Sequence, residues 1–290
     1  MESAANQPPL IAIVGETASG KSSLAMQIAE KFNGEIICAD SRTIYKGMDI
    51  GTAKPSVEDQ ARVPHHLLDV VEPNESFTAA DFKRLAFKAI KDISERGKVP
   101  LLVGGSGLYV DAVLYDFQFR PPADPARREM LQKFTVEELQ LTLLEQDIPL
   151  PENARNSRHL IRALETGGEQ PEHGELRPNT LLIGLSIDRE TLKENVARRV
   201  EQMFADGFID EVRALIATFG VGAPALRAPG YKAATAYLEG EATLQEAKEQ
   251  FIQNDLQLAK RQRTWFKRNK SIRWCKTDEA VDLVTTFLNK

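Results

Sequence analysis

Cysteine is scarce in this chain of 290 residues, since Cys38 and Cys275 are the only two. Two cysteines are too few for a disulfide framework or a cysteine-rich zinc site. No apolar run approaches the roughly 20 residues that a membrane-spanning helix needs. Residues 1–9 lack a charged-then-apolar signal pattern, and the chain has no internal repeat. We therefore expect a cytoplasmic, monomeric protein that does not contact a membrane.

The overall charge excludes a further class of protein. A formal net charge of −5 argues against a chain that is basic throughout and coats nucleic acid, although it permits a local basic patch. Hydrophobic residues make up 42% of the chain and charged residues 27%, which is ordinary for a globular protein. The length suits one large domain, or a core with a smaller appendage.

A glycine-rich stretch near the start has the spacing of a P-loop, which is a glycine, four free positions and then Gly-Lys-Ser. An apolar run at 10–14 predicts a buried strand before it, and apolar residues at helical spacing predict a helix after it. Backbone amides at the start of such a helix bind phosphate. By itself the motif predicts nucleotide binding, with ATP the first candidate. Its residues are Gly15, Glu16, Thr17, Ala18, Ser19, Gly20, Lys21 and Ser22.

Strands and helices alternate in the first part of the chain, which predicts an α/β protein. The fold class we expect is a P-loop NTPase-like parallel sheet flanked by helices, with a helical insertion domain. A capping box at Thr78 and Asp81 predicts the start of one helix, and another at Thr243 and Glu246 predicts the start of a long one. Predicted strands lie at 10–14, 35–39, 99–103, 180–185 and 272–275.

The pattern changes from about Tyr115, where prolines and short polar helices replace strands until residue 180. We assign 115–179 to the helical insertion, and 1–114 with 180–290 to the α/β core. Within the core, the glycines and prolines between 220 and 230 predict a loop.

Asp40 directly follows the predicted strand at 35–39, where the ligand crevice of an open α/β sheet lies. A kinase or ATPase needs another metal-binding carboxylate at a strand end, but the strand at 99–103 runs into the turn Gly-Gly-Ser-Gly. Asp40 therefore either serves a metal, or accepts a proton while Ser22 and phosphate oxygens hold Mg²⁺. A third interpretation is that Asp40 only caps a turn.

A stretch near the C-terminus, from Lys260 to Lys276, is rich in lysine and arginine and contains no acidic residue. Its aromatic residues include Trp265 and Phe266. This combination fits contacts to a polyanion backbone together with base stacking. The alternative is a solvated helix face.

Other arginines are also candidates for an anion site. Arg199 lies beside the apolar stripe of a predicted helix at 189–205, where its guanidinium needs a partner such as a diphosphate, unless it extends to solvent. Arg155, Arg158 and Arg162 form a stripe that either pairs with nearby glutamates or belongs to a kinase lid.

Several longer motifs together identify a family. The chain resembles the bacterial tRNA dimethylallyltransferases, also called tRNA isopentenylpyrophosphate transferases, over nearly its whole length. The most specific motifs are Ile-Gly-Thr-Ala-Lys-Pro and Arg-Gln-x-Thr-Trp-Phe. The motifs lie at 15–22, 40–55, 64–69, 104–109, 162–165, 230–231 and 259–266.

The resemblance implies transfer of a dimethylallyl group from dimethylallyl diphosphate to N6 of adenosine-37, the adenosine 3′-adjacent to the anticodon of tRNA, with release of diphosphate. It implies that the P-loop residues 15–22 and Arg199 hold the diphosphate, with Mg²⁺ at Ser22. It also implies that Asp40 is the general base and that Ser106 supports it.

The resemblance further implies that the insertion holds the anticodon stem-loop. Glu16 stands where the family usually has proline, Thr43 replaces a common glutamine, and Ser106 replaces threonine. The positions matching tRNA-contacting segments are Asp40, Ser41, Arg42, Thr43, Ser106, Arg128, Arg158, His159, Leu160, Ile161, Arg162, Arg227, Gly230, Tyr231, Lys232, Lys260, Arg261, Gln262, Arg263, Thr264, Trp265, Phe266 and Lys267.

Three other functions are compatible with parts of the chain. An adenylate isopentenyltransferase would prenylate free AMP or ATP, but needs neither the basic C-terminal stretch nor the insertion. A small-molecule kinase would use the P-loop and an arginine lid. A non-catalytic RNA-binding protein would not need Lys21, Ser22 and Asp40 intact.

Overall fold

The computed structural model describes residues 7–119, 124–169 and 174–289. The chain divides into two compact units. The first comprises Met1–Tyr115 and Leu176–Lys290, and the second comprises Asp116–Glu175. Among the residues that the structure describes, no helix has both the length and the apolar character needed to span a bilayer.

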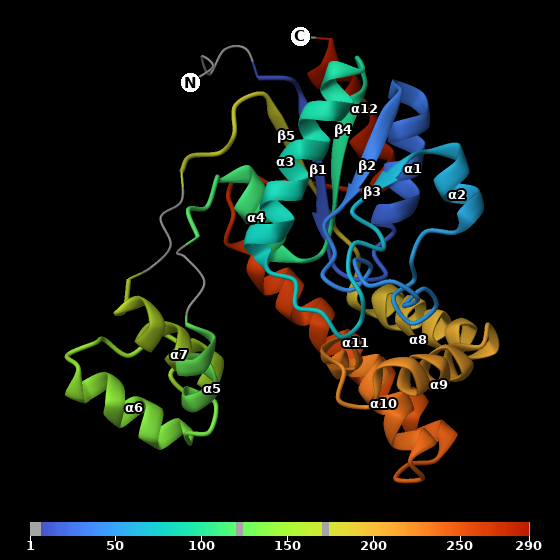
Figure 1. Cartoon of the computed structure of the whole chain (residues 1–290). Helices are drawn as coiled ribbons and strands as arrows, with labels where there is room; N and C mark the ends of the chain where they lie inside the picture. The colour runs from blue at the N-terminus through green and yellow to red at the C-terminus, as the bar shows by residue number, and fades with distance from the viewer. Residues whose placement is uncertain (1–6, 120–123, 170–173, 290) are drawn as a thin grey trace. The chain divides into compact units, whose positions relative to one another are not determined.

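Within its described residues the first unit is built on a single six-stranded sheet in the order β3-β2-β4-β1-β5-β6, and each pair of neighbours is parallel (Figure 1). The predicted α/β fold with a parallel sheet flanked by helices is therefore confirmed. The strands are β1 (Leu10–Gly15), β2 (Gly34–Cys38), β3 (His65–His66), β4 (Val99–Gly104), β5 (Thr180–Leu185) and β6 (Arg273–Cys275).

Helices cover both faces of the sheet because its strands are apolar on both sides. Ile11 and Ile13 of β1 pack in one cluster with α1 (Lys21–Phe32) and α12 (Thr277–Leu288). The alternate β1 residues pack in another cluster with α3 (Ala79–Glu95) and α4 (Gly107–Leu114). The two-residue periodicity of a strand thus sends adjacent side chains into different cores.

A third cluster lies among the helices that follow β5. They are α8 (Arg189–Ala205), α9 (Phe208–Phe219), α10 (Pro229–Leu238) and α11 (Leu244–Lys267). The loop predicted at 220–230 is only partly correct, because Pro224–Arg227 forms a 3-10 turn and Pro229 begins α10. Proline is well tolerated in the first turn of a helix, and the small residues of α10 give no apolar periodicity that would predict it.

Both predicted capping boxes are confirmed, at Thr78 for α3 and at Thr243 for α11. A short helix, α2 (Val57–Arg62), and the strand β3 were not predicted. In β3 the His66 Nε2 atom lies 2.7 Å from a carboxylate oxygen of the buried Glu35, which also contacts Arg96 and Lys98. His66 therefore contacts a buried carboxylate that two cations also reach, whereas Nδ1 of the neighbouring His65 lies 2.7 Å from the Val63 carbonyl oxygen.

The second unit is helical, with α5 (Pro125–Leu131), α6 (Val136–Glu145) and α7 (Ser157–Thr166). Leucines at 131, 139, 143, 160 and 164 form its core. Its bounds, Asp116–Glu175, fall within the segment 115–179 that the sequence assigns to an insertion. This unit has a hydrophobic core of its own.

Candidate active site

The P-loop connects the end of β1 to the start of α1. Gly20, the residue before α1, has φ = +90°, a backbone conformation that glycine adopts without strain. The Lys21 ammonium donates a hydrogen bond to the Glu16 carbonyl oxygen and thereby closes the loop. The Ser19 hydroxyl is buried and has no hydrogen-bond partner. An anion held in this loop would provide that hydroxyl with an acceptor.

Asp40 follows β2 and lies beside the turn after β4. Its Oδ1 accepts a hydrogen bond from the Arg42 amide at 2.7 Å, and the Ser106 hydroxyl accepts one from the Ser41 amide at 3.0 Å. A Cβ atom at Gly104 would lie only 2.0 Å from the Ala39 carbonyl oxygen, so the close approach of these strand ends requires glycine. Ser106 therefore fixes the backbone next to the Asp40 carboxylate.

Arg199 extends from α8 toward the P-loop and pairs with a carboxylate that the sequence did not single out. Its Nη2 atom contacts Oδ2 of Asp255 on α11, and its Nε is buried without a partner. Burial raises the pKa of Asp255, and the adjacent Arg199 guanidinium opposes that rise. Burial lowers the pKa of Lys21 to about 8, a shift opposed by the charge of Asp40.

Three cavities meet at Arg199, which lines each of them. A cavity of about 350 Å³ is lined by the P-loop, Asp40 and apolar residues that include Ile36 and Val103. A second, of about 500 Å³, is lined by Asp40, Ser106 and residues of α10 and α11. The third, of about 970 Å³, lies against the segment 49–57 and α8. Asp40 thus faces both the phosphate loop and the cavity beneath α11.

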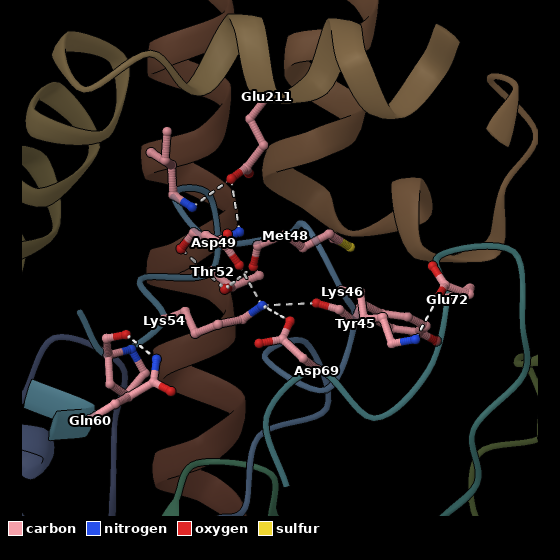
Figure 2. Close-up of polar contacts among 12 residues, drawn as sticks. Tyr45, Lys46, Met48, Asp49, Thr52, Lys54, Gln60, Asp69, Glu72 and Glu211 are labelled. Carbon is pink, nitrogen blue, oxygen red and sulfur yellow. Dashed lines mark hydrogen bonds and ion pairs between the residues drawn. The ribbon is translucent and has the colours of Figure 1, made fainter. Parts of the chain in front are cut away.

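The segment after Asp40 is held in place by two polar clusters, which Figure 2 shows. The Glu211 carboxylate accepts hydrogen bonds from the amides of Asp49, Ile50 and Gly51 at 2.8, 2.6 and 3.1 Å. The Lys54 side chain, only 3% exposed, pairs with Asp49 and with Asp69 at 2.6 Å. These contacts fix the Ile-Gly-Thr-Ala-Lys-Pro segment, part of which lines the cavities.

The helix α11 presents two different faces in its basic stretch. Lys260, Arg261, Thr264, Trp265 and Lys267 are exposed, whereas Gln262 and Phe266 are buried. Gln262 Oε1 accepts a hydrogen bond from the Thr17 amide at 2.7 Å, and Arg263 pairs with Glu16. The indole nitrogen of Trp265 donates to Asp111 at 2.7 Å. One face of α11 therefore contacts the P-loop while the other faces solvent.

The remaining positions expected to contact tRNA occupy different surroundings. In the first unit Thr43, Gly230 and Tyr231 are buried, and Arg227 and Lys232 are exposed. The Tyr231 hydroxyl donates to Glu211 at 2.6 Å.

In the second unit Arg158 and His159 are exposed on α7, whereas Leu160 and Ile161 belong to the core. Arg128 and Arg162 both pair with the buried carboxylate of Glu165, at 2.6 and 3.3 Å. These two arginines therefore have an intramolecular partner within the unit.

Comparison with known proteins shows which family this chain is similar to. The family described as IPP transferase matches residues 43–269. The chain is 42% identical to the tRNA dimethylallyltransferase of Anoxybacillus flavithermus, over 94% of this chain and 92% of that protein. It is 40% identical to the Bacillus subtilis tRNA dimethylallyltransferase, over 95% and 93%.

The chain belongs to the IPP transferase family.

Solved structures of family members share its fold. The tRNA isopentenylpyrophosphate transferase of Bacillus halodurans superposes with a TM-score of 0.75 at 38% identity, covering 97% of this chain and 95% of that one. A eukaryotic dimethylallyltransferase acting on tRNA gives a TM-score of 0.78 at 25% identity, covering 93% and 74%. The resemblance inferred from the motifs is therefore confirmed.

Sequence reasoning missed two features of this IPP transferase site. Asp255 interrupts the buried stripe of α11 that includes Phe251, Ala259 and Phe266, and a single acid at that spacing was a usable signal. The pairing of Glu16 with Arg263 had no such signal, because 247 residues separate the two positions.

Proposed function

We propose that this protein transfers the dimethylallyl group from dimethylallyl diphosphate to N6 of adenosine-37 of tRNA and releases diphosphate. The observation that carries the proposal is that Asp40 lines both the P-loop cavity and the cavity beneath α11. A carboxylate in that position can serve an acceptor base on one side and a phosphate-bearing donor on the other. The names of the family members support the same reaction.

In the proposed reaction the N6 nitrogen bonds to the allylic carbon as the carbon–oxygen bond to the diphosphate breaks. Asp40 accepts the N6 proton, a contribution typically worth about 10²–10⁴-fold in rate. Ser106 positions the backbone beside that carboxylate. Lys21, Arg199 and the loop amides stabilise the charge that develops on the diphosphate. The apolar wall at Ile36 and Val103 is suited to the hydrocarbon part of the donor.

The donor set at the loop suits Mg²⁺. Ser22 is exposed in the first turn of α1 and lines the P-loop cavity, and Mg²⁺ favours oxygen ligands while keeping several waters. The described residues contain no group of three or more histidine, cysteine or acidic side chains able to hold a metal. Ser22 would thus hold the ion together with diphosphate oxygens, and the ion would neutralise charge on the leaving group.

The acceptor would be an anticodon stem-loop, whose adenosine must leave its stack to reach Asp40. The exposed cations of α11, Lys260, Arg261 and Lys267, supply backbone contacts, and Trp265 supplies a stacking surface. In the second unit, Arg158 and His159 of α7 are exposed positions for further contacts. A cytoplasmic location follows from this choice of acceptor.

The test offers labelled dimethylallyl diphosphate with an unmodified anticodon stem-loop or with AMP. Label is expected in N6-prenyladenosine of the RNA, and label on AMP alone would contradict the proposal. Asp40→Asn is expected to lower kcat by about 10²–10⁴-fold and to leave the dissociation constant of pyrophosphate unchanged. Asp210→Asn, which removes a carboxylate from an exposed pair on α9, is the matched control.

A further inference from the structure

The P-loop is attached to α11 through two consecutive residues on each side. Glu16 is only 4% exposed, and its two carboxylate oxygens lie 2.6 Å from Nε and 2.8 Å from Nη2 of Arg263. The amide of the next loop residue, Thr17, donates a hydrogen bond to Gln262 Oε1 at 2.7 Å. Arg263 Nη2 donates a hydrogen bond to Glu16 Oε2, whereas the approach of Nε to Oε1 is an ion-pair contact without hydrogen-bond geometry, so one directed bond and one close charge contact hold the carboxylate. The loop is therefore positioned by the helix and not only by β1 and α1.

The charge of Glu16 makes this attachment necessary. A carboxylate buried within an anion-binding loop opposes a bound diphosphate and is costly unless a cation compensates it. Arg263 forms an ion pair with that carboxylate and is itself about one-third exposed. The backbone oxygen of the same Glu16 accepts the hydrogen bond of the Lys21 ammonium. A displacement of Glu16 would thus also displace the lysine that faces the donor.

Arg263 differs in this respect from its neighbours on the helix. Lys260, Arg261 and Lys267 are exposed, whereas the guanidinium of Arg263 is turned to the loop and occupied by Glu16. A guanidinium held by a buried carboxylate contributes little to neutralising RNA phosphates. The position of Arg263 within the basic stretch is therefore not evidence of an RNA contact.

We infer that Arg263 is a positioning residue of the diphosphate site, acting through Glu16 on the P-loop and Lys21. The inference rests on the proposed function only in taking the donor to be a diphosphate. It assigns Glu16 a role in this chain, as the acceptor that allows α11 to hold the loop.

The experiment measures two affinities on the full-length chain. Calorimetry in the presence of Mg²⁺ gives the dissociation constant of pyrophosphate from the protein. Fluorescence anisotropy at several salt concentrations gives the dissociation constant of an anticodon stem-loop from the protein. Arg263→Met is expected to weaken pyrophosphate binding about tenfold, the effect of roughly one charged hydrogen bond, and to leave the salt dependence of RNA binding unchanged. Lys260→Met is expected to do the reverse, lowering the salt slope by about one.

A double variant tests whether Arg263 acts through the charge of Glu16. Glu16→Gln with Arg263→Met removes both charges and is expected to bind pyrophosphate more tightly than Arg263→Met alone, because the uncompensated carboxylate is gone. If Arg263→Met does not fold, the double variant is compared with the wild type, and an unchanged salt slope of RNA binding is then the expected result, whereas a reduced slope overturns the inference. Glu201→Gln, which breaks the exposed pair between α8 and Lys248 of α11, is expected to match the wild type in both assays.

The inference is overturned if Arg263→Met reduces the RNA salt slope while pyrophosphate affinity is unchanged. It is also overturned if the double variant binds pyrophosphate no better than the single one. Neither result depends on catalysis. Failure of the wild type to prenylate RNA would contradict the proposed function and leave the pyrophosphate titrations to decide the role of Arg263.

Discussion

Asp255 illustrates how a single residue outside the recognised motifs can matter for the site that we propose for the donor. Its carboxylate contacts Arg199, which lines all three cavities. Because the Arg199 guanidinium is only partly exposed, its orientation depends on that partner. The sequence singles out Arg199 by its place beside the apolar stripe of α8, and the family resemblance assigns it to the diphosphate, whereas Asp255, the residue that holds it, comes from α11.

Replacement of Asp255 by asparagine tests this dependence. We expect the KM for dimethylallyl diphosphate to rise about tenfold, the scale of one charge-assisted hydrogen bond, with a smaller change in kcat. Steady-state kinetics at saturating RNA would measure both values. A lower KM would mean that the carboxylate acts mainly by repelling the diphosphate, which would contradict a positioning role.

Lys21 makes a pH dependence of donor binding expected. Burial lowers its pKa to about 8 in the free protein, and a bound diphosphate favours the protonated ammonium. Affinity is therefore constant well below pH 8 and falls as the pH rises through that value, when the free lysine loses its proton. Calorimetry with dimethylallyl diphosphate between pH 6.5 and 9.5 would measure the fall.

The control for this pH profile is Lys21→Arg, whose guanidinium stays charged over the whole range. Any titration of the ligand itself is common to both proteins. The decline above pH 8 should be smaller in the arginine variant, and equal slopes in the two proteins would show that Lys21 does not titrate there.

At the scale of elements, α11 joins the hydrophobic clusters of the first unit and also contacts the P-loop. Its buried stripe joins two hydrophobic clusters through Phe251 and Phe266. Its polar residues reach Arg199 and the P-loop, and its exposed cations face solvent. A change that loosens this helix is therefore expected to affect the proposed donor site as well as any RNA contact.

Thr243 caps α11, so its replacement by alanine is a test at this scale. The Thr243 hydroxyl accepts a hydrogen bond from the Glu246 amide at 3.2 Å, and the Glu246 carboxylate accepts one from the Thr243 amide at 2.7 Å. Loss of such a cap costs about 1 kcal/mol in the free energy of unfolding. Urea denaturation would measure it, with Thr243→Ser as a conservative control. An unchanged midpoint would mean that the start of α11 frays in the native state.

At the scale of the whole molecule, the two units have separate hydrophobic cores. The first unit carries the P-loop, Asp40, Arg199 and α11. The chain leaves it and returns to it at adjacent points, since the Arg177 amide donates to the Leu114 carbonyl at 2.7 Å. Removal of the second unit therefore requires only a short connection.

Replacement of 116–175 by a short glycine-serine linker is expected to preserve pyrophosphate binding within about a factor of two to three, since the residues that we propose as its ligands lie in the first unit and distant changes are roughly additive. RNA affinity is expected to fall, because the exposed Arg158 and His159 of α7 are lost. Calorimetry and anisotropy would measure the two constants. Unchanged RNA affinity would show that the second unit does not contribute to binding of the acceptor RNA.

The sequence by itself was sufficient for the local features of this protein. The P-loop, the strand end at Asp40 and the capping boxes depend on residues that are close together in the chain, and motifs of that kind can be recognised directly. The alternation of strands and helices was likewise enough to predict the parallel sheet. The small residues of α10 and the two-residue strand β3 carried too little periodic signal.

The tertiary structure alone decided which distant residues share the site. Glu16 with Arg263, Arg199 with Asp255 and Glu211 with the amides of 49–51 meet only because helices following β5 pack near the strand ends. The basic stretch of α11 could be seen in the sequence, but its division into a buried and an exposed face could not. Burial sets which charges are occupied by a partner, and burial is a property of the packed chain.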